Sequence, residues 1–143
     1  MGRSMGLKWL QYYAKIAEET AKLSTAKKLQ VGCVIVKDNR ILSIGYNGMP
    51  SGWSNECEDV VTPTKTKPEV LHAEANALMK LCRSTDSSEG ATLFVTHFPC
   101  IECAKLVYQA GISQVYYIND YEATKGSGRN FLEKAGIEVC QVK

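Results

Sequence analysis

The sequence predicts an α/β domain in which five strands form a mixed sheet with helices on both faces. Two observations support this fold class. An amphipathic helical pattern is followed by two adjacent strand-like segments that indicate a hairpin, and strand and helix patterns then alternate from residue 91 to the C-terminus. The alternation favours parallel strands connected by helices, whereas the hairpin adds an antiparallel pair, so the sheet is expected to be mixed.

The first half of the chain predicts one helix, two strands and a long loop. Residues 7–24 carry apolar side chains at helical spacing with Lys and Glu between them, which predicts an amphipathic helix packed on the sheet. Residues 31–36 and 41–46 are rich in β-branched and aliphatic side chains and flank a short polar turn, which predicts the hairpin. Residues 51–69 show no period and contain two prolines, so they are expected to form a functional or mobile loop.

The second half predicts the alternating elements. A helix is expected to begin after His72, and Gly111 and Gly136 mark the ends of two later helices, because glycine is favoured just beyond a helix C-terminus. The predicted elements are helix 73–81, strand 91–97, helix 101–110, strand 115–118, helix 130–135 and strand 137–142.

Length and composition limit the classes of protein. A chain of 143 residues suits a single domain, here 1–143, that buries a core without disulfides. The net charge is +2 and no run of Lys or Arg exceeds two residues, which argues against a nucleic-acid surface. No apolar run approaches the length of a membrane span. We therefore expect a small-molecule partner, with neither nucleic acid nor membrane.

The six cysteines do not predict a disulfide framework. The N-terminal segment lacks the apolar core and small-residue cleavage site of a secretory leader, so a reducing compartment is expected. Cys33, Cys82 and Cys140 fall in apolar strand or helix patterns and are predicted to be buried core thiols.

Two short stretches, His72-Ala73-Glu74 and Pro99-Cys100-Ile101-Glu102-Cys103, predict a metal site. If Cys100 opens a helix, the sulfurs of Cys100 and Cys103 lie on the same side of it, near free backbone N–H groups that stabilise thiolates. Together with the His72 imidazole they make three ligands, which leaves the fourth position of a catalytic zinc ion open for water. Zinc lowers the pKa of such a water to about 7.

Glu74 is predicted to be the general acid and base beside this metal. In the first turn of a helix, an i, i+2 pair presents a ligand and a nearby carboxylate without both binding the ion. A structural zinc site would need a fourth ligand, such as His97 or a distant cysteine, and a redox Cys-x-x-Cys pair would leave His72 and Glu74 unexplained. We leave His97 out of the metal set; it either lines the pocket or points away from it.

Two further segments suggest ligand contacts. The glycines around Asn47 allow close backbone approach, and its amide offers both a donor and an acceptor, although a turn that merely requires Gly and Asn has the same pattern. Residues 23–28 contain two hydroxyls together with Lys27 and Lys28, which suit either a phosphate site or, more commonly, a solvated loop.

The paired motifs H-x-E and P-C-x-x-C are the signature of zinc-dependent nucleobase deaminases. With Gly-Tyr-Asn-Gly-Met-Pro at 45–50, the chain resembles the deoxycytidylate branch of the cytidine and deoxycytidylate deaminase superfamily over nearly its full length. The resemblance implies a cytidine deaminase-like, three-layer α/β/α fold and hydrolysis of dCMP to dUMP and ammonia, supplying dUMP for thymidylate synthesis. Two alternatives remain: a deaminase of a free nucleoside or base, and a non-catalytic nucleotide-binding module.

The resemblance also assigns residues by position. It implies that Asn47 contacts the deoxyribose, that Tyr121 closes over the pyrimidine, and that Ala73 and Ser24 take part in substrate binding. It places Gly48 in a regulatory nucleotide site and Arg83 near a subunit boundary, although a cation at a helix C-terminus explains Arg83 equally well.

One position departs from the family pattern. Many relatives have an arginine before the serine that corresponds to Ser24, whereas this chain has Leu23, so phosphate binding is expected to shift to Lys27, Lys28 or a neighbouring subunit.

The resemblance implies a regulated assembly as well. Relatives form homohexamers that dCTP activates and dTTP inhibits, each nucleotide binding with Mg²⁺. Some relatives hold a second, structural zinc in the long loop; we predict none here, because only Cys57 lies in that loop and no histidine precedes His72. A cytoplasmic location is expected, in a bacterial cytosol or a virus-infected host cell.

Overall fold

A computed structural model of the chain describes residues 5–123 and 125–143. The fold class predicted from the sequence is confirmed, and every predicted element is found with its ends displaced by no more than three residues. The elements in chain order are α1 (Leu7–Ala21), β1 (Gly32–Lys37), β2 (Arg40–Tyr46), α2 (Ala73–Cys82), β3 (Thr92–His97), α3 (Ile101–Gln109), β4 (Gln114–Asn119), α4 (Arg129–Lys134) and β5 (Glu138–Gln141).

The five strands form one mixed sheet in the order β2-β1-β3-β4-β5. Strand β1 pairs antiparallel with both β2 and β3, whereas β3, β4 and β5 are parallel to one another. Asp38 and Asn39 connect β1 to β2 with positive φ angles of 52° and 57°. These angles suit the tight hairpin turn that matches the twist of antiparallel strands, and Asp and Asn tolerate them better than most residues.

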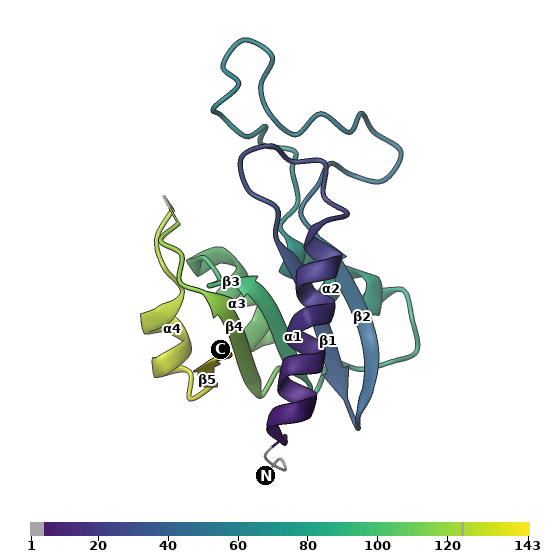
Figure 1. Cartoon of the computed structure of the whole chain (residues 1–143), viewed down its shortest axis with the longest axis vertical. Helices are drawn as coiled ribbons and strands as arrows, with labels where there is room; N and C mark the ends of the chain where they lie inside the picture. The colour runs from purple at the N-terminus through teal and green to yellow at the C-terminus, as the bar shows by residue number, and fades with distance from the viewer. Residues whose placement is uncertain (1–4, 124) are drawn as a thin grey trace.

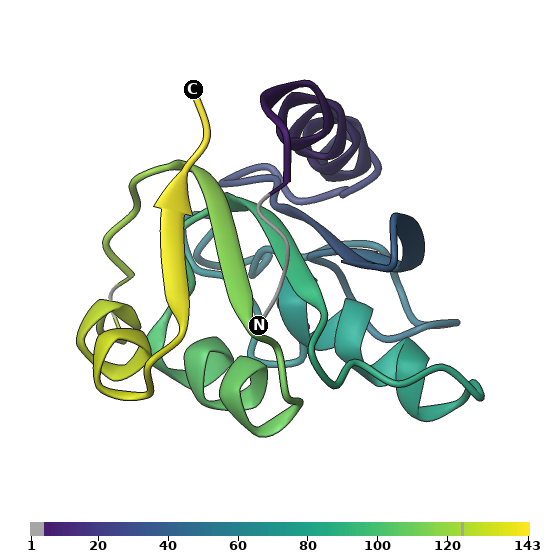
Figure 2. The same ribbon diagram turned by 90° about the horizontal axis from the view of Figure 1, so that it is seen from below.

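Helices cover both faces of the sheet, so the domain has three layers (Figures 1 and 2). Helix α1 lies on one face, where Tyr13 and Ala17 pack against Val34 and Phe94. Helices α2, α3 and α4 lie on the other face over a larger core. Successive residues of β1 contribute to opposite cores, as the alternation of side chains along a strand requires.

The end of the first helix and the burial of two cysteines differ from the sequence-based expectations. Helix α1 ends at Ala21, so Leu23 lies beyond it and is 56% exposed. Cys33 is buried as predicted, but the predictions for Cys82 and Cys140 are wrong, because both are exposed. Cys82 is the last residue of α2, and Cys140 lies on the edge strand β5 beyond the reach of α1, so neither has a covering layer.

The chain between β2 and α2 extends from one end of the sheet as a long loop (Figure 1). Gly48 and Leu71 exchange backbone hydrogen bonds of 3.1 and 2.8 Å, which close the base of this loop. A second bridge joins Glu58 to Thr66 within it. In the part of the chain that the structure describes, no helix is long and apolar enough to cross a membrane.

Two glycines let the helices lie directly on the strands. A Cβ at Gly32 would meet the backbone of Ala17 and Ala21 in α1, and a Cβ at Gly45 would meet the backbone of Ala73 and Ala77 in α2. No side chain separates strand and helix at these points, so Gly45 sets the position of α2 and of the His72 and Glu74 side chains at its start.

We expect Gly45→Ala to lower the free energy of unfolding by about 2–4 kcal/mol, because α2 must move to admit the methyl group. Gly48→Ala is the matched control, since a Cβ there meets only the Tyr46 ring at 4.0 Å. Urea denaturation of the three proteins measures the effect, and equal midpoints for both variants would contradict it.

Candidate active site

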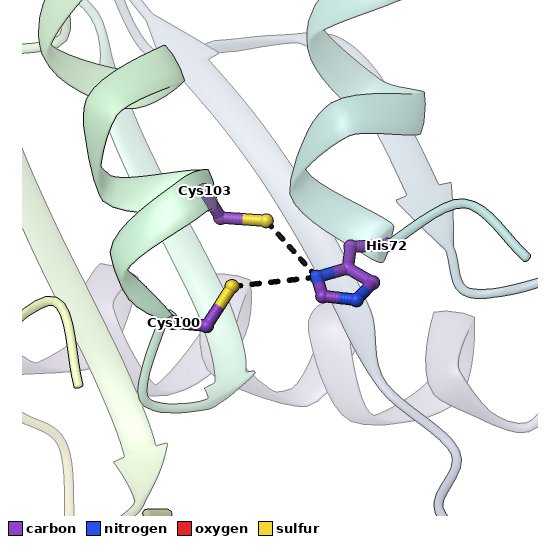
Figure 3. A group of neighbouring side chains, drawn as sticks. All are labelled: His72, Cys100 and Cys103. Atoms are coloured by element: carbon purple, nitrogen blue, oxygen red, sulfur yellow. Dashed lines mark hydrogen bonds between the residues drawn. The ribbon is translucent and has the colours of Figure 1, made fainter. Parts of the chain in front are cut away.

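His72, Cys100 and Cys103 form one compact group of ligand atoms (Figure 3). His72 Nδ1 lies 3.2 Å from Cys103 Sγ and 3.5 Å from Cys100 Sγ, and the three ligand atoms lie within 4.8 Å of one another. A tetrahedral zinc ion with ordinary bond lengths holds its nitrogen and sulfur ligands about 3.5 Å apart. The geometry therefore fits a zinc ion bound by one imidazole and two thiolates.

Two helix N-termini converge on this group. His72 is the N-cap residue of α2 and Cys100 is the N-cap residue of α3. Both helices therefore begin where the sequence predicted, at residues 73 and 101. Hydrogen bonding from Cys103, supported by His72, lowers the pKa of the Cys100 thiol to about 3. Hydrogen bonding to Cys100 and burial raise the pKa of Cys103, so the pair holds one negative charge. A divalent cation compensates such charge and favours ionisation of the second thiol.

Glu74 lies in the first turn of α2 and is only 4% exposed. Burial raises the pKa of its carboxyl group to about 7. The three-atom group does not include Glu74, although the carboxylate and His72 line the same cavity. The carboxylate is thus positioned beside the candidate metal without being needed as a ligand.

The cavity has a volume of about 510 Å³ and is lined by segments distant in sequence. Among its lining residues are His72 and Cys100 of the ligand group, together with Ala73 and Glu74. Four lysines also line it, which we call the lysine rim: Lys28, Lys65, Lys67 and Lys125. They outnumber the lining carboxylates of Glu58 and Glu74, so the cavity favours an anionic ligand.

Asn47 lines the cavity, but its side chain is held by the neighbouring backbone. Its Oδ1 accepts a hydrogen bond from Val31 N–H at 2.8 Å, and its Nδ2 donates to Leu29 O at 2.8 Å. Ser24 is buried, and its hydroxyl donates to Asn47 O at 2.7 Å. Ser24 therefore supports the wall that Asn47 forms and does not itself line the cavity.

The remaining predicted residues occupy different places. Ala73 and Tyr121 line the cavity, and so does His97, which settles the question that the sequence left open. Gly48 lies at the base of the long loop. Arg83 caps the C-terminal end of α2, at the opposite end of the helix from His72.

The backbone of Lys27 and Lys28 is occupied within the chain. Both N–H groups donate to Glu58 Oε2, at 2.9 and 3.2 Å. Nearby, the Thr25 hydroxyl donates to Asn55 O at 2.6 Å. These bonds fasten the long loop to the 24–28 segment, which explains how residues 64–68 come to lie against the cavity.

The fold and the site together define a class of protein: a three-layer α/β domain with a three-ligand metal group and a buried carboxylate at its helix N-termini. The pattern of the cytidine and deoxycytidylate deaminase zinc-binding region matches residues 7–119. The chain belongs to this family of deaminases, which confirms the resemblance seen in the sequence and supports zinc as its metal.

Known relatives agree with this membership. A human deoxycytidylate deaminase is 40% identical over 124 residues, which are 80% of this chain and 66% of the relative. ComE operon protein 2 of Bacillus subtilis is 37% identical over 139 residues, which are 96% of this chain and 72% of the relative. A crystal structure of dCMP deaminase from the cyanophage S-TIM5 with dCMP and dUMP superposes with a TM-score of 0.90 at 42% identity, covering 96% and 99% of the two chains.

Sequence reasoning missed part of the cavity wall. Glu58, Lys65 and Lys67 lie in the long loop, whose lack of periodicity gave no hint of where it folds. The density of lysine in 65–67 was the available signal for an anion-binding role.

We expect Glu58→Ala to release the long loop, because two backbone N–H groups lose their shared acceptor. Cleavage of the loop by a protease at native conditions should become about tenfold faster. Glu56→Ala is the matched control, since Glu56 lies in the same loop and its side chain makes no hydrogen bond with the described residues. Equal cleavage rates in the two variants would show that the Glu58 contacts do not hold the loop.

Proposed function

We propose that this chain hydrolyses dCMP to dUMP and ammonia. The observation that carries the proposal is a single cavity that combines the candidate metal group, the buried Glu74 carboxylate and the lysine rim. The deaminase family supplies the reaction type, and the relatives that act on deoxycytidylate support the substrate. The lysine rim favours a nucleotide over an uncharged nucleoside or base.

The metal is proposed to be zinc, held by His72, Cys100 and Cys103. When bound, zinc acts as a Lewis acid that lowers the pKa of a coordinated water to about 7. The two helix N-termini hold the ligands in place and stabilise the thiolates before substrate arrives.

Glu74 is proposed to move both protons of the reaction. A carboxylate at this place takes a proton from the attacking water and gives it to ring N3, which makes C4 more electrophilic. It then takes the proton of the hydroxyl that has added to C4 and delivers it to the departing amine, so the C4–N bond breaks, the carbonyl of dUMP forms and ammonia leaves as a neutral molecule. Burial of the side chain keeps solvent from competing for these protons.

The other cavity residues are proposed to orient the nucleotide. The Ala73 N–H lies at the start of α2 and has no partner within the helix, so it is available to an acceptor on the base. Tyr121 offers its ring to the pyrimidine, and Asn47 shapes the wall beside the sugar. The 5′-phosphate is proposed to meet the lysine rim, where Lys28 takes part through its side chain.

Family resemblance further supports a homohexamer that supplies dUMP for thymidylate synthesis. In this assembly dCTP is the proposed activator and dTTP the proposed inhibitor, and each binds with Mg²⁺. In this proposal Gly48 belongs to the regulatory nucleotide site, and Arg83, at the far end of α2, lies near a subunit boundary. Binding of dCTP and dTTP to the purified protein, together with its mass in solution, tests this assembly.

Loss of the cytosine ultraviolet absorbance tests the reaction, with dCMP, deoxycytidine and CMP as substrates, each with and without dCTP. Turnover of dCMP well above that of deoxycytidine is expected. Comparable rates on the two would instead indicate a nucleoside deaminase, and binding of dCTP without release of ammonia would indicate a non-catalytic module.

Glu74→Gln should retain zinc and lose about 10²- to 10⁴-fold in kcat, because the amide keeps the shape of the side chain and cannot shuttle protons. Glu102→Gln is the control, since Glu102 is an exposed residue that pairs with Lys105 on the outside of α3. Undiminished deamination of dCMP by the Glu74 variant would show that another group moves the protons.

Cys103→Ala should reduce the zinc content from about one ion per chain to nearly none at sub-micromolar free zinc, because two ligands remain. Cys82→Ala controls for loss of a thiol, since Cys82 is exposed and outside the ligand group. Atomic absorption after dialysis measures the content, and full zinc retention by the Cys103 variant would exclude that sulfur as a ligand.

A further inference from the structure

His97 is a cavity residue that the proposed chemistry does not use. It is the last residue of β3, its ring is half-buried, and it packs edge-on against the Tyr121 ring with centroids 6.0 Å apart. Its Nδ1 lies 2.9 Å from the Thr96 hydroxyl oxygen. One imidazole nitrogen of His97 is therefore hydrogen-bonded to the side chain of Thr96.

The hydrogen-bond pattern around Thr96 fixes which nitrogen carries the proton. Thr96 is 3% exposed, and its Oγ1 accepts the Gly32 N–H at 3.1 Å. The hydroxyl has one proton to donate, and among the residues that the structure describes, His97 Nδ1 is its one acceptor. The opposite arrangement would leave a buried hydroxyl proton without an acceptor. His97 is thus the tautomer with Nε2–H, and burial lowers its pKa and favours the neutral ring.

The Nε2–H donor lacks an acceptor within the described chain, and so does the Tyr121 hydroxyl. We call the side of the cavity formed by His97, Tyr121 and Lys125 the donor wall. These residues lie at or shortly after the carboxyl ends of the parallel strands β3 and β4, and α/β sheets bind ligands at such ends. The two carboxylates that line the cavity, Glu58 and Glu74, come from other segments.

We propose that His97 is a specificity-determining residue that donates its Nε2–H to a phosphate oxygen of the nucleotide, and that Thr96 is the positioning residue that sets this tautomer. The identity of the nucleotide rests on the proposed function. An ammonium, a phenol and an imidazole N–H on one wall match the several anionic oxygens of a phosphate, whereas the carbonyl of a pyrimidine is a single neutral acceptor.

Kinetics with two substrates test this assignment. His97→Phe keeps a ring against Tyr121 and removes the donor, so kcat/KM for dCMP should fall about 10- to 100-fold, mainly through KM. The same variant should change kcat/KM for deoxycytidine, which has no phosphate, by less than about twofold. His97→Gln places an amide N–H near the position of Nε2 and should recover most of the loss. Equal losses on both substrates, or no loss on dCMP, would overturn the proposal.

Nitrogen-15 NMR of the zinc-loaded, full-length protein tests the tautomer without any activity measurement. The chain has two histidines, so the spectrum of histidine-labelled protein is simple to assign. His97 should show a bare Nδ1 and a protonated Nε2, and Thr96→Ser should preserve this state while Thr96→Val should lose it. Addition of dUMP should shift the Nε2–H resonance of His97, and deoxyuridine should not.

A protonated Nδ1 on His97, or equal shifts with dUMP and deoxyuridine, would overturn the inference. A wild-type protein that fails to deaminate dCMP would instead overturn the proposed function, and the tautomer would still be read from the spectrum. The two failures are therefore distinguishable.

Discussion

The site depends on the meeting of two helix N-termini at one point beside the sheet. Helix α2 starts at His72 and helix α3 starts at Cys100, so each helix contributes a ligand at its cap and directs free N–H groups toward it. This arrangement requires α2 to lie directly on β2, which only a glycine at position 45 permits. Because Gly45 has no side chain, β2 and α2 lie close enough for the His72 nitrogen to meet the sulfurs of Cys100 and Cys103.

Much of the rest of the cavity is assembled from connecting segments, whereas His97 comes from the end of strand β3. The long loop reaches the cavity because Glu58 binds the backbone of the 27–28 segment. This contact brings Lys65 and Lys67 to the cavity, which Lys125, a residue that follows β4, also lines. The proposed catalytic groups therefore lie at the N-termini of core helices, whereas the lysine rim lies on connections and His97 lies at the end of β3. Such a division allows a family to change substrates without disturbing its metal centre.

The sequence was sufficient for the fold and for the centre of the site, because periodicity and motif spacing act over short distances. The cysteines at 100 and 103 share one turn of one helix, and His72 and Glu74 share another, so local geometry was enough to place them. The exposure of Cys82 and Cys140 could not be read in this way, since it depends on which parts of a helix and of the sheet the other elements leave uncovered. The partners of Glu58 and Thr96 likewise arise only when distant segments meet.

The bonds of Asn47 affect how variants at that position are interpreted. Its amide spans the backbone of Leu29 and Val31 and its own carbonyl receives the Ser24 hydroxyl, so one residue ties three stretches of chain together. Weak nucleotide affinity in an Asn47 mutant would then be ambiguous, because collapse of this junction and loss of a sugar contact would produce the same titration curve. A crystal structure of the mutant would distinguish collapse of the junction from loss of the sugar contact, whereas its nucleotide affinity would not.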